Sequence, residues 1–290
     1  MTDDTINDLD AGRLDRYFNR LAPHYLSHDW LQQEVGERAL ERLDGIRLAP
    51  RLIVDAGAGA GRHARSLAKR YRAATIIQFD RAEAMLAASR EHGPRWRSPH
   101  RYACGDISQI PLANDTVDLV LCTCVLQWCG QLEQTLGELR RILKPGGLLL
   151  LAFPGPDTLS ELRAALAAVS GGAHVNRFPD MHDVGDLLGR QGFADPVMEC
   201  ERLTIEYKDV EGLLTDLRLG GSINAIRSRP RGLLGRRRHA TFAAAYEAQR
   251  RNEKLPVTAE LIIGHAWAAA GARNVTGESQ IFPLKRLRRR

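Results

Sequence analysis

Residues 52–61 read Leu-Ile-Val-Asp-Ala-Gly-Ala-Gly-Ala-Gly, and this segment constrains the fold more than any other. A short apolar run that ends in an acidic residue and then in alternate glycines predicts a buried strand, a tight turn and the start of a helix. Glycines let the backbone approach a nucleotide-like ligand closely. The segment therefore predicts an α/β protein with a ligand site at the turn, although many α/β nucleotide-binding proteins carry a similar run.

Acidic residues also stand at the ends of two later expected strands. The run 75–79 ends in Asp80, about 25 residues after Asp55, where a carboxylate can hold both hydroxyls of a ribose. Asp106 and Ile107 follow the next expected strand. A dinucleotide site usually has its third glycine three residues after the second, whereas the glycines here alternate. The spacing therefore favours a mononucleoside-type ligand over a pyrophosphate.

Strands and helices alternate along most of the chain. Apolar strands that alternate with helices predict a mainly parallel sheet with helices on both faces. The first expected strands lie near 51–55, 75–80, 101–103, 117–122 and 147–153, with helices near 61–71, 82–91 and 131–143 between them. Later elements are expected as helices at 157–169 and 180–190, a strand near 198–207, helical structure over 209–254 and a last strand within 261–270.

The order of these elements suggests one core with helical additions. An apolar stripe that includes Leu14, Phe18 and Tyr25 predicts N-terminal helices, which Pro23 is expected to divide into two. We expect these helices and the later insertion to form a lid over the carboxyl ends of the strands, where ligands bind in such sheets. The expected domains are an N-terminal lid segment 1–45, a core 46–208, a basic helical insertion 209–256, a final strand 257–270 and a basic tail 271–290.

The composition is that of an ordinary globular protein. The 290 residues are 44% hydrophobic and 26% charged, and no apolar run reaches the roughly 18 residues that span a bilayer. The acidic, polar N-terminus argues against a targeting leader, so we expect a cytoplasmic monomer without membrane contact. The five cysteines form no C-x-x-C pair, and this spacing indicates neither a metal site nor a disulfide framework.

The formal net charge of +6 is unevenly distributed. Six arginines fall within residues 227–238, with no acidic residue among them, and five of the last six residues are basic. Such clusters suggest an acidic macromolecular partner. Because the inner cluster lacks interleaved aromatic residues for base stacking, nucleic acid is the less favoured partner.

The Asp-x-Gly-x-Gly-x-Gly run resembles the first motif of class I S-adenosylmethionine (SAM) methyltransferases, and segments 105–112, 114–120 and 139–147 resemble their later motifs. The resemblance implies a Rossmann-like fold with a mainly parallel seven-stranded sheet, helices on both faces and a helical lid. It also implies SAM as cofactor. The cofactor-binding residues that it implies are Asp55, Gly57, Gly59, Asp80, Arg81, Met85, Asp106, Ile107 and Thr123.

From about residue 12 to about residue 268 the chain resembles the malonyl-acyl-carrier-protein O-methyltransferases of biotin synthesis. Segments 18–25, 127–129 and 176–178 carry the resemblance, while Ala58, Ala60, Thr123 and the pair Ala259-Glu260 depart from the common pattern. The same stretch resembles complex I assembly factors that use SAM and hydroxylate an arginine. A methyltransferase for RNA or for another small molecule is a third interpretation.

The carrier-protein interpretation assigns roles to several residues. The acceptor would be an ionised malonyl carboxylate, which needs no general base but needs a group that orients it, and we expect Arg177 to bind it in a bidentate manner. Tyr25 and His24 are expected to close over the sulfonium, and Trp128 to line the pocket. Arg236 and Arg237 of the basic loop 227–238 are expected to contact the acidic acyl carrier protein.

Overall fold

The structure is a computed structural model that describes residues 8–94, 96–169, 174–230, 232 and 235–270. The expected basic tail 271–290 therefore lies outside the described residues, as does Arg231 of the basic loop. No helix within the described ranges is both long and apolar enough to cross a membrane.

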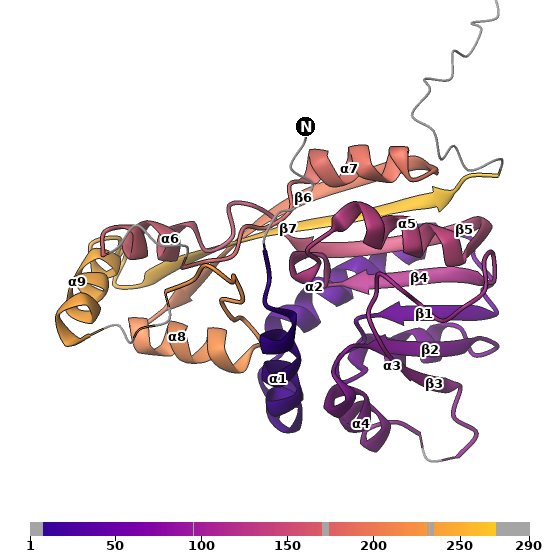
Figure 1. The fold of residues 1–290 in the computed structure, drawn as a ribbon, viewed down its shortest axis with the longest axis horizontal. Coiled ribbons are helices and arrows are strands. Elements are labelled where there is room, and N and C mark those ends of the chain that lie inside the picture. The colour runs from indigo at the N-terminus through magenta and orange to yellow at the C-terminus, as the bar shows by residue number, and fades with distance from the viewer. Residues whose placement is uncertain (1–7, 95, 170–173, 231, 233–234, 271–290) are drawn as a thin grey trace, which may run out of the picture.

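Helices and strands alternate along the described chain (Figure 1). The helices are α1 (Ala11–Leu21), η1 (Ala22–Ser27), α2 (Trp30–Glu41), η2 (Arg42–Gly45), α3 (Arg62–Arg70), α4 (Glu83–Glu91), η3 (Leu126–Trp128), α5 (Leu132–Ile142), α6 (Ser160–Ala167), α7 (Met181–Arg190), α8 (Val210–Leu219) and α9 (Arg236–Glu247), where η marks a 3₁₀ helix. The strands are β1 (Leu52–Ala56), β2 (Thr75–Asp80), β3 (His100–Cys104), β4 (Val117–Thr123), β5 (Leu143–Pro154), β6 (Phe193–Tyr207) and β7 (Leu255–Ala268).

The seven strands form one sheet in the order β3-β2-β1-β4-β5-β7-β6. The pairs from β3 to β5 are parallel, and β7 runs antiparallel to both of its neighbours, β5 and β6. The expected mainly parallel seven-stranded sheet is confirmed. Parallel strands place their carboxyl ends at one edge, so the turns after β1, β2 and β4 meet there.

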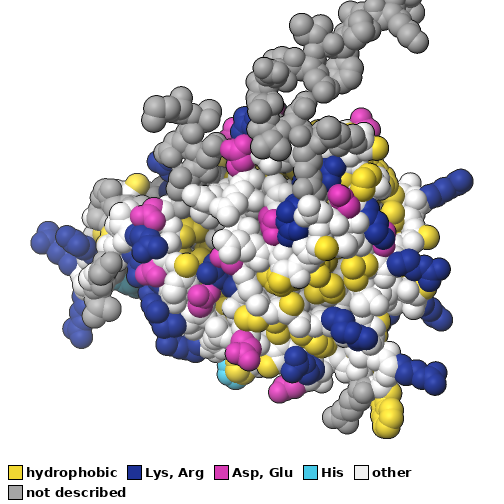
Figure 2. All heavy atoms as spheres, turned by 45° about the vertical axis from the view of Figure 1, so that its right-hand side comes forward, with side chains coloured by type: hydrophobic (Ala, Val, Ile, Leu, Met, Phe, Trp, Pro, Cys, Tyr) yellow, Lys and Arg dark blue, Asp and Glu magenta, His cyan; other side chains and the backbone are white. Residues whose placement is uncertain are grey.

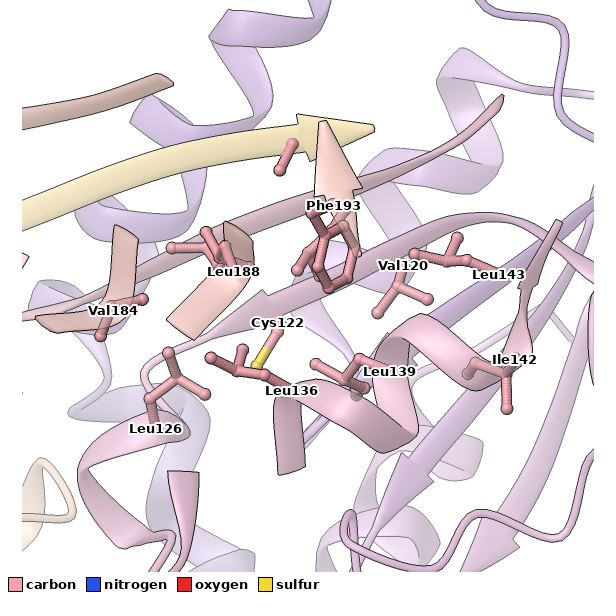
Figure 3. Close-up of a cluster of buried hydrophobic side chains, with 14 of the residues drawn as sticks. Val120, Cys122, Leu126, Leu136, Leu139, Ile142, Leu143, Val184, Leu188 and Phe193 are labelled. Atoms are coloured by element: carbon pink, nitrogen blue, oxygen red, sulfur yellow. The ribbon is translucent and has the colours of Figure 1, made fainter. Parts of the chain in front are cut away.

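Alternate residues of the central strands face opposite sides of the sheet, and each side is buried by helices. Val120 and Cys122 of β4 pack in a cluster with Leu136 of α5 and Leu188 of α7 (Figure 3). On the other side, Leu119 and its alternate neighbours pack in a second cluster with residues of α2 and α3. This two-sided burial explains why these strands read as continuous apolar runs in the sequence.

Strands β6 and β7 extend well beyond the rest of the sheet. They pair from Phe193 with Ala268 as far as Tyr207 with Leu255, whereas β5 accompanies β7 only as far as Leu261. The projecting ribbon carries α6, α8 and α9 (Figure 1), and these helices enclose an apolar cluster of their own that includes Leu213 and Phe242. We call this ribbon with its three helices the ribbon lid.

Three sequence-based boundaries were wrong in this part of the chain. Strand β6 begins at residue 193 instead of 198, because a bulge between Ala194 and Val197 accommodates Pro196, which ordinarily argues against a strand. Strand β7 begins at 255 instead of 261, in the half-exposed ribbon where polar residues alternate with apolar ones. The segment 209–254 is not helical throughout, because turns and irregular backbone separate α8 from α9.

The N-terminal helices lie beside the carboxyl ends of the strands. The Asp10 side chain caps α1 by accepting a hydrogen bond from the Arg13 backbone N–H (3.0 Å). Pro23 stands at the beginning of η1, so the expected division into two helical segments is confirmed. Residues of α1 and η1 pack against α4 in a small apolar cluster, and α2 packs on the sheet.

Candidate functional site

A cavity of about 670 Å³ lies at the carboxyl ends of β1, β2 and β4. The turns after these strands line one side of the cavity, and α1, η1, α2 and the turn after α8 line the other sides. Its volume falls within the range of small-molecule sites, which usually combine an apolar lining with a few polar groups. The cavity also reaches the ribbon lid, where Leu162, Leu213 and Val257 contribute to its lining.

The glycine turn forms one wall of the cavity. Gly57 has a φ of +82° and donates a backbone hydrogen bond to the Phe79 carbonyl (2.7 Å), and a Cβ at this position would overlap the Val125 side chain. Gly59 also has a positive φ, of +51°. These conformations strain any other residue, so glycine is required for the turn. The backbone from Gly57 to Ala60 consequently faces the cavity directly.

Asp80 lines the cavity at the end of β2. One of its carboxylate oxygens accepts the Gly59 N–H (2.8 Å), and the other accepts the Ala82 N–H (2.8 Å). Burial raises the pKa of Asp80, and these two hydrogen bonds act in the opposite direction. Each carboxylate oxygen can accept a further hydrogen bond, so the fixed group is able to bind two neighbouring hydroxyls of a ligand.

Further predicted cofactor residues surround Asp80. Arg81 reaches back to the Asp15 carboxylate of α1 (2.5 Å). Burial acts to raise the pKa of Asp106, but two hydrogen bonds from Ser108 and the charge of Arg81 outweigh it and lower the pKa. The structure brings all of these predicted residues to the cavity lining, namely Gly57, Gly59, Asp80, Arg81, Met85, Asp106, Ile107 and Thr123.

Asp55 does not line the cavity, and its predicted contact with the cofactor stays a prediction. It precedes the glycine turn on β1, is 1% exposed, and one of its carboxylate oxygens has no partner among the described residues. Burial raises its pKa to about 7, with a further contribution from the charge of Asp80, while the Ala64 N–H partly offsets the rise. Asp55 therefore lies beneath the turn, buried within the core.

Aromatic side chains close the cavity beside the glycine turn. The Tyr25 ring lies between two glycines, 3.5 Å from the position of a Cβ on Gly59 and 3.3 Å from that of a Cβ on Gly221. Burial raises the pKa of Tyr25 well above its ordinary value, so its hydroxyl stays protonated. The Phe18 ring packs edge-on against Trp128, with 5.8 Å between ring centroids, and all three aromatic residues line the cavity.

Two of the residues predicted to bind the acceptor lie outside the cavity lining. Arg177 is exposed, which contradicts its predicted role as a buried cation. The preceding residue, Asn176, turns inward instead: it donates to the Ile223 carbonyl (3.1 Å) and accepts the Ala225 N–H (3.3 Å). Neighbouring side chains in this non-helical segment point in different directions, and so Asn176 is buried while Arg177 faces outward. His24 is also exposed and does not line the cavity.

The basic loop divides into two parts. Arg227 pairs with the Asp8 carboxylate (2.9 Å) and Arg229 with Asp10 (3.7 Å), so the N-terminal segment partly neutralises the first part. Arg236 and Arg237 are exposed in the first turn of α9, outside the cavity lining, and this turn contains no acidic residue. Figure 2 shows Lys and Arg side chains projecting at the end of the molecule where α9 lies.

One buried ion pair was not anticipated from the sequence. The Arg62 guanidinium binds both carboxylate oxygens of Asp29 (2.6 and 2.9 Å) and also donates to the Leu26 carbonyl (3.0 Å). Arg62 directly follows the third glycine, and Asp29 precedes α2 and is 3% exposed. The pair ties the N-terminal helices to the glycine turn. No spacing rule predicts a contact across 33 positions in the chain.

Several known proteins are similar to this chain. Residues 54–151 match the family model described as "Methyltransferase domain". The chain is 42% identical over 278 residues to the malonyl-[acyl-carrier protein] O-methyltransferase of Gallionella capsiferriformans (strain ES-2), covering 94% of this chain and 96% of the relative. It is 45% identical over 264 residues to the protein of the same name from Methylovorus sp. (strain MP688), covering 89% of each.

Solved structures support the fold. The YcgJ protein of Bacillus subtilis matches with a TM-score of 0.59 and 16% identity, covering 81% of this chain and all of that chain. Phosphoethanolamine N-methyltransferase 2 of Haemonchus contortus, solved with S-adenosylhomocysteine, matches with a TM-score of 0.51 and 16% identity, covering 81% of this chain and 52% of that one. At these identities the likeness concerns the fold alone.

Proposed function

The chain belongs to the family of malonyl-[acyl-carrier protein] O-methyltransferases, and we propose that it methylates the free carboxylate of malonyl-acyl carrier protein with SAM as methyl donor. The observation that carries this proposal is the extent of the similarity. It covers the lid segments as well as the core, and the lid surrounds the space that an acceptor must enter. The product would be the methyl ester with which biotin synthesis starts.

The residues of the cavity fit SAM. Asp80 would hold the ribose hydroxyls, Asp106 and Ile107 would border the adenine, and the backbone at Gly57 and Gly59 would border the methionine part. The absence of a Cβ at these glycines keeps the wall of the cavity open. Bound SAM supplies a methyl group on a sulfonium, and its transfer forms a C–O bond to the carboxylate, breaks the C–S bond with the electron pair passing to sulfur, and releases no proton.

The chain's own groups would exclude water and orient the acceptor. A carboxylate is ionised at neutral pH, so this chemistry needs no general base, and the protonated Tyr25 would not serve as one. Tyr25, Phe18 and Trp128 close the cavity beside the glycine turn. Holding the reacting groups together in a dry site supplies most of what such a transfer requires.

The first turn of α9 is proposed to receive the acidic carrier protein. Three successive arginines, Arg236, Arg237 and Arg238, occupy the positive end of a helix, where cations are unfavourable for folding. Their placement at an exposed helix end fits an electrostatic role toward a negatively charged partner. The N-terminal pairing of Arg227 and Arg229 leaves this turn as the more accessible part of the basic loop.

The proposal is tested by incubating the purified protein with SAM and malonyl-acyl carrier protein and measuring the mass of the carrier protein. We expect the addition of one methyl group, removable by an esterase, and no such product from acetyl-acyl carrier protein. Complementation of a strain that cannot start biotin synthesis supplies an independent test. The alternative of an arginine hydroxylase predicts the addition of an oxygen to a protein substrate, and an unmodified malonyl carrier would contradict our proposal.

A further inference from the structure

The cavity lining presents its positive charges already paired with carboxylates of the same chain. Among the described residues the lining contains no lysine, and each of its arginines forms an ion pair. The pairs are Arg62 with Asp29, Arg81 with Asp15 and Arg227 with Asp8. His63 also lines the cavity, and burial lowers its pKa to about 4, so it is neutral at neutral pH. His28 and His174 complete the set of basic side chains in the described part of the lining. The arginines of the cavity therefore reach an acceptor only in competition with carboxylates of the chain itself.

Neutral hydrogen-bond donors stand at the cavity instead. The Tyr25 hydroxyl and the Trp128 indole N–H make no hydrogen bond with any residue that the structure describes, and both side chains line the cavity. Tyr25 is placed against the glycine turn at Gly59, and Trp128 follows the end of β4 and is braced by Phe18. Half-buried Tyr and Trp side chains ordinarily satisfy their polar atoms, which makes a ligand the expected partner.

The chemistry of methyl transfer gives a reason for neutral donors. The carboxylate loses its charge as the new C–O bond forms, and the methyl donor itself brings a positive charge. A fixed arginine would stabilise the fully charged carboxylate more than the transition state, and this would raise the barrier. A neutral N–H or O–H orients the same oxygen while losing less stabilisation as the charge declines.

We propose that the Tyr25 hydroxyl and the Trp128 indole N–H bind the acceptor carboxylate and determine the preference for a malonyl over an uncharged acyl group. This inference rests on the proposed function, because it assumes that the acceptor is a carboxylate. In this arrangement two neutral hydrogen-bond donors among aromatic side chains bind the carboxylate, in place of a cationic side chain. The protonated state of Tyr25 at neutral pH supports its role as a donor.

The test uses Tyr25→Phe, which keeps the ring and removes only the hydroxyl, and Trp128→Phe, which keeps an aromatic side chain but replaces the indole and so removes its N–H. The full-length protein is saturated with S-adenosylhomocysteine, and the binding of malonyl-acyl carrier protein and acetyl-acyl carrier protein is measured in competition. Each variant is expected to lose about tenfold or more of the wild-type preference for the malonyl form. The affinity for SAM, measured by calorimetry, should change by no more than about twofold.

Matched controls come from elsewhere in the chain. Tyr71→Phe removes a hydroxyl from a side chain outside the cavity lining, and Trp96→Phe alters a side chain that is 89% exposed. Both controls should keep the malonyl preference. Arg177→Met and His28→Gln test other side chains as partners of the carboxylate, because Arg177 is the residue predicted from the sequence and His28 lines the cavity.

The outcomes separate the inference from the proposed function. If the wild type does not methylate malonyl-acyl carrier protein, the proposed function fails. If the wild type is active and Tyr25→Phe and Trp128→Phe both remain as selective as the wild type, the inference is overturned. It is equally overturned if Arg177→Met or His28→Gln abolishes the preference while both phenylalanine variants retain it.

Discussion

The sheet core and the ribbon lid are built in different ways. In the core, β1 and β4 are buried on both faces by the apolar side chains of the covering helices. The lid side of the cavity joins three distant segments, near residues 8–10, 174–178 and 222–229. The difference teaches that local sequence patterns suffice to place the glycine-turn side of the cavity, whereas the lid side depends on contacts between remote segments.

The contacts that close the lid side are mostly polar. Tyr17 donates to the Arg218 carbonyl, and Gln32 donates to the Gly220 carbonyl, so α1 and α2 satisfy carbonyl groups at the end of α8. Asn176 and Asn224 bind backbone groups across the neighbouring segments. Such contacts fix orientation but contribute less stability than the buried apolar clusters of the core. We therefore expect the two regions to respond differently to equivalent changes.

The largest difference between the core and the ribbon lid is expected from two matched substitutions, each of which shortens a buried leucine to alanine. Leu139→Ala in α5 and Leu255→Ala at the start of β7 each remove a fully buried leucine. We expect Leu139→Ala to lower the free energy of unfolding of the whole protein by about 2–5 kcal/mol. Leu255→Ala should mainly accelerate hydrogen exchange in α8 and α9, with little change in β1 to β5. Equal acceleration everywhere in both variants would show that the two regions unfold as one unit.

Asp55 offers a pH-dependent comparison within the core. Its pKa rises from 3.8 to about 7 on folding, so between about pH 4 and pH 7 the folded protein keeps a proton that the unfolded chain has released. The free energy of unfolding should therefore fall as pH rises through this window, by about 2–4 kcal/mol in total. Asp55→Asn should flatten this dependence and be more stable than the wild type above pH 7. Denaturant titrations of both proteins at pH 5 and pH 8 test this, and an identical pH dependence would contradict it.

Asp80 tests whether the cofactor site is independent of the lid. Asp80→Ala should weaken SAM binding by about 1.5–3 kcal/mol, or roughly tenfold to a hundredfold, because the ribose hydroxyls lose a charged acceptor. Calorimetric titration measures this loss. Leu255→Ala is the comparison variant and should keep nearly normal SAM affinity. If Asp80→Ala binds SAM with unchanged affinity, Asp80 does not bind the ribose hydroxyls.

The smallest expected effect concerns the outer surface of the lid. Reversing Arg236 and Arg237 to Glu should lower kcat/KM for malonyl-acyl carrier protein several-fold at low salt and weaken its salt dependence. Reversing Arg47 and Arg72, which are exposed near the opposite edge of the sheet, is the matched control and should leave both quantities unchanged. If both pairs of reversals behave alike, net charge alone would explain the effect.

The sequence by itself determined the sheet core and the cofactor side of the cavity. Continuous apolar runs predicted β1, β2 and β4 to within about two residues, because two-sided burial leaves a signal in each strand alone. The glycine turn and the acidic strand ends predicted Gly57, Gly59 and Asp80 as neighbours, because parallel strands bring their carboxyl ends to one edge. Asp55 shows the limit of this reasoning, since the motif did not reveal which side chain lies beneath the turn.

Only the tertiary structure decided the lid side of the cavity. Asn176 and Arg177 are adjacent in the sequence, yet Asn176 is buried, with 4% of its surface exposed, and Arg177 is exposed. No periodic pattern in this non-helical segment distinguished the two residues. The pairing of Asp29 with Arg62, and of Asp8 with Arg227, joins positions that no local rule connects. The physical reason is that charges and hydrogen-bond donors act through space. Their partners are therefore set by how the lid folds onto the core.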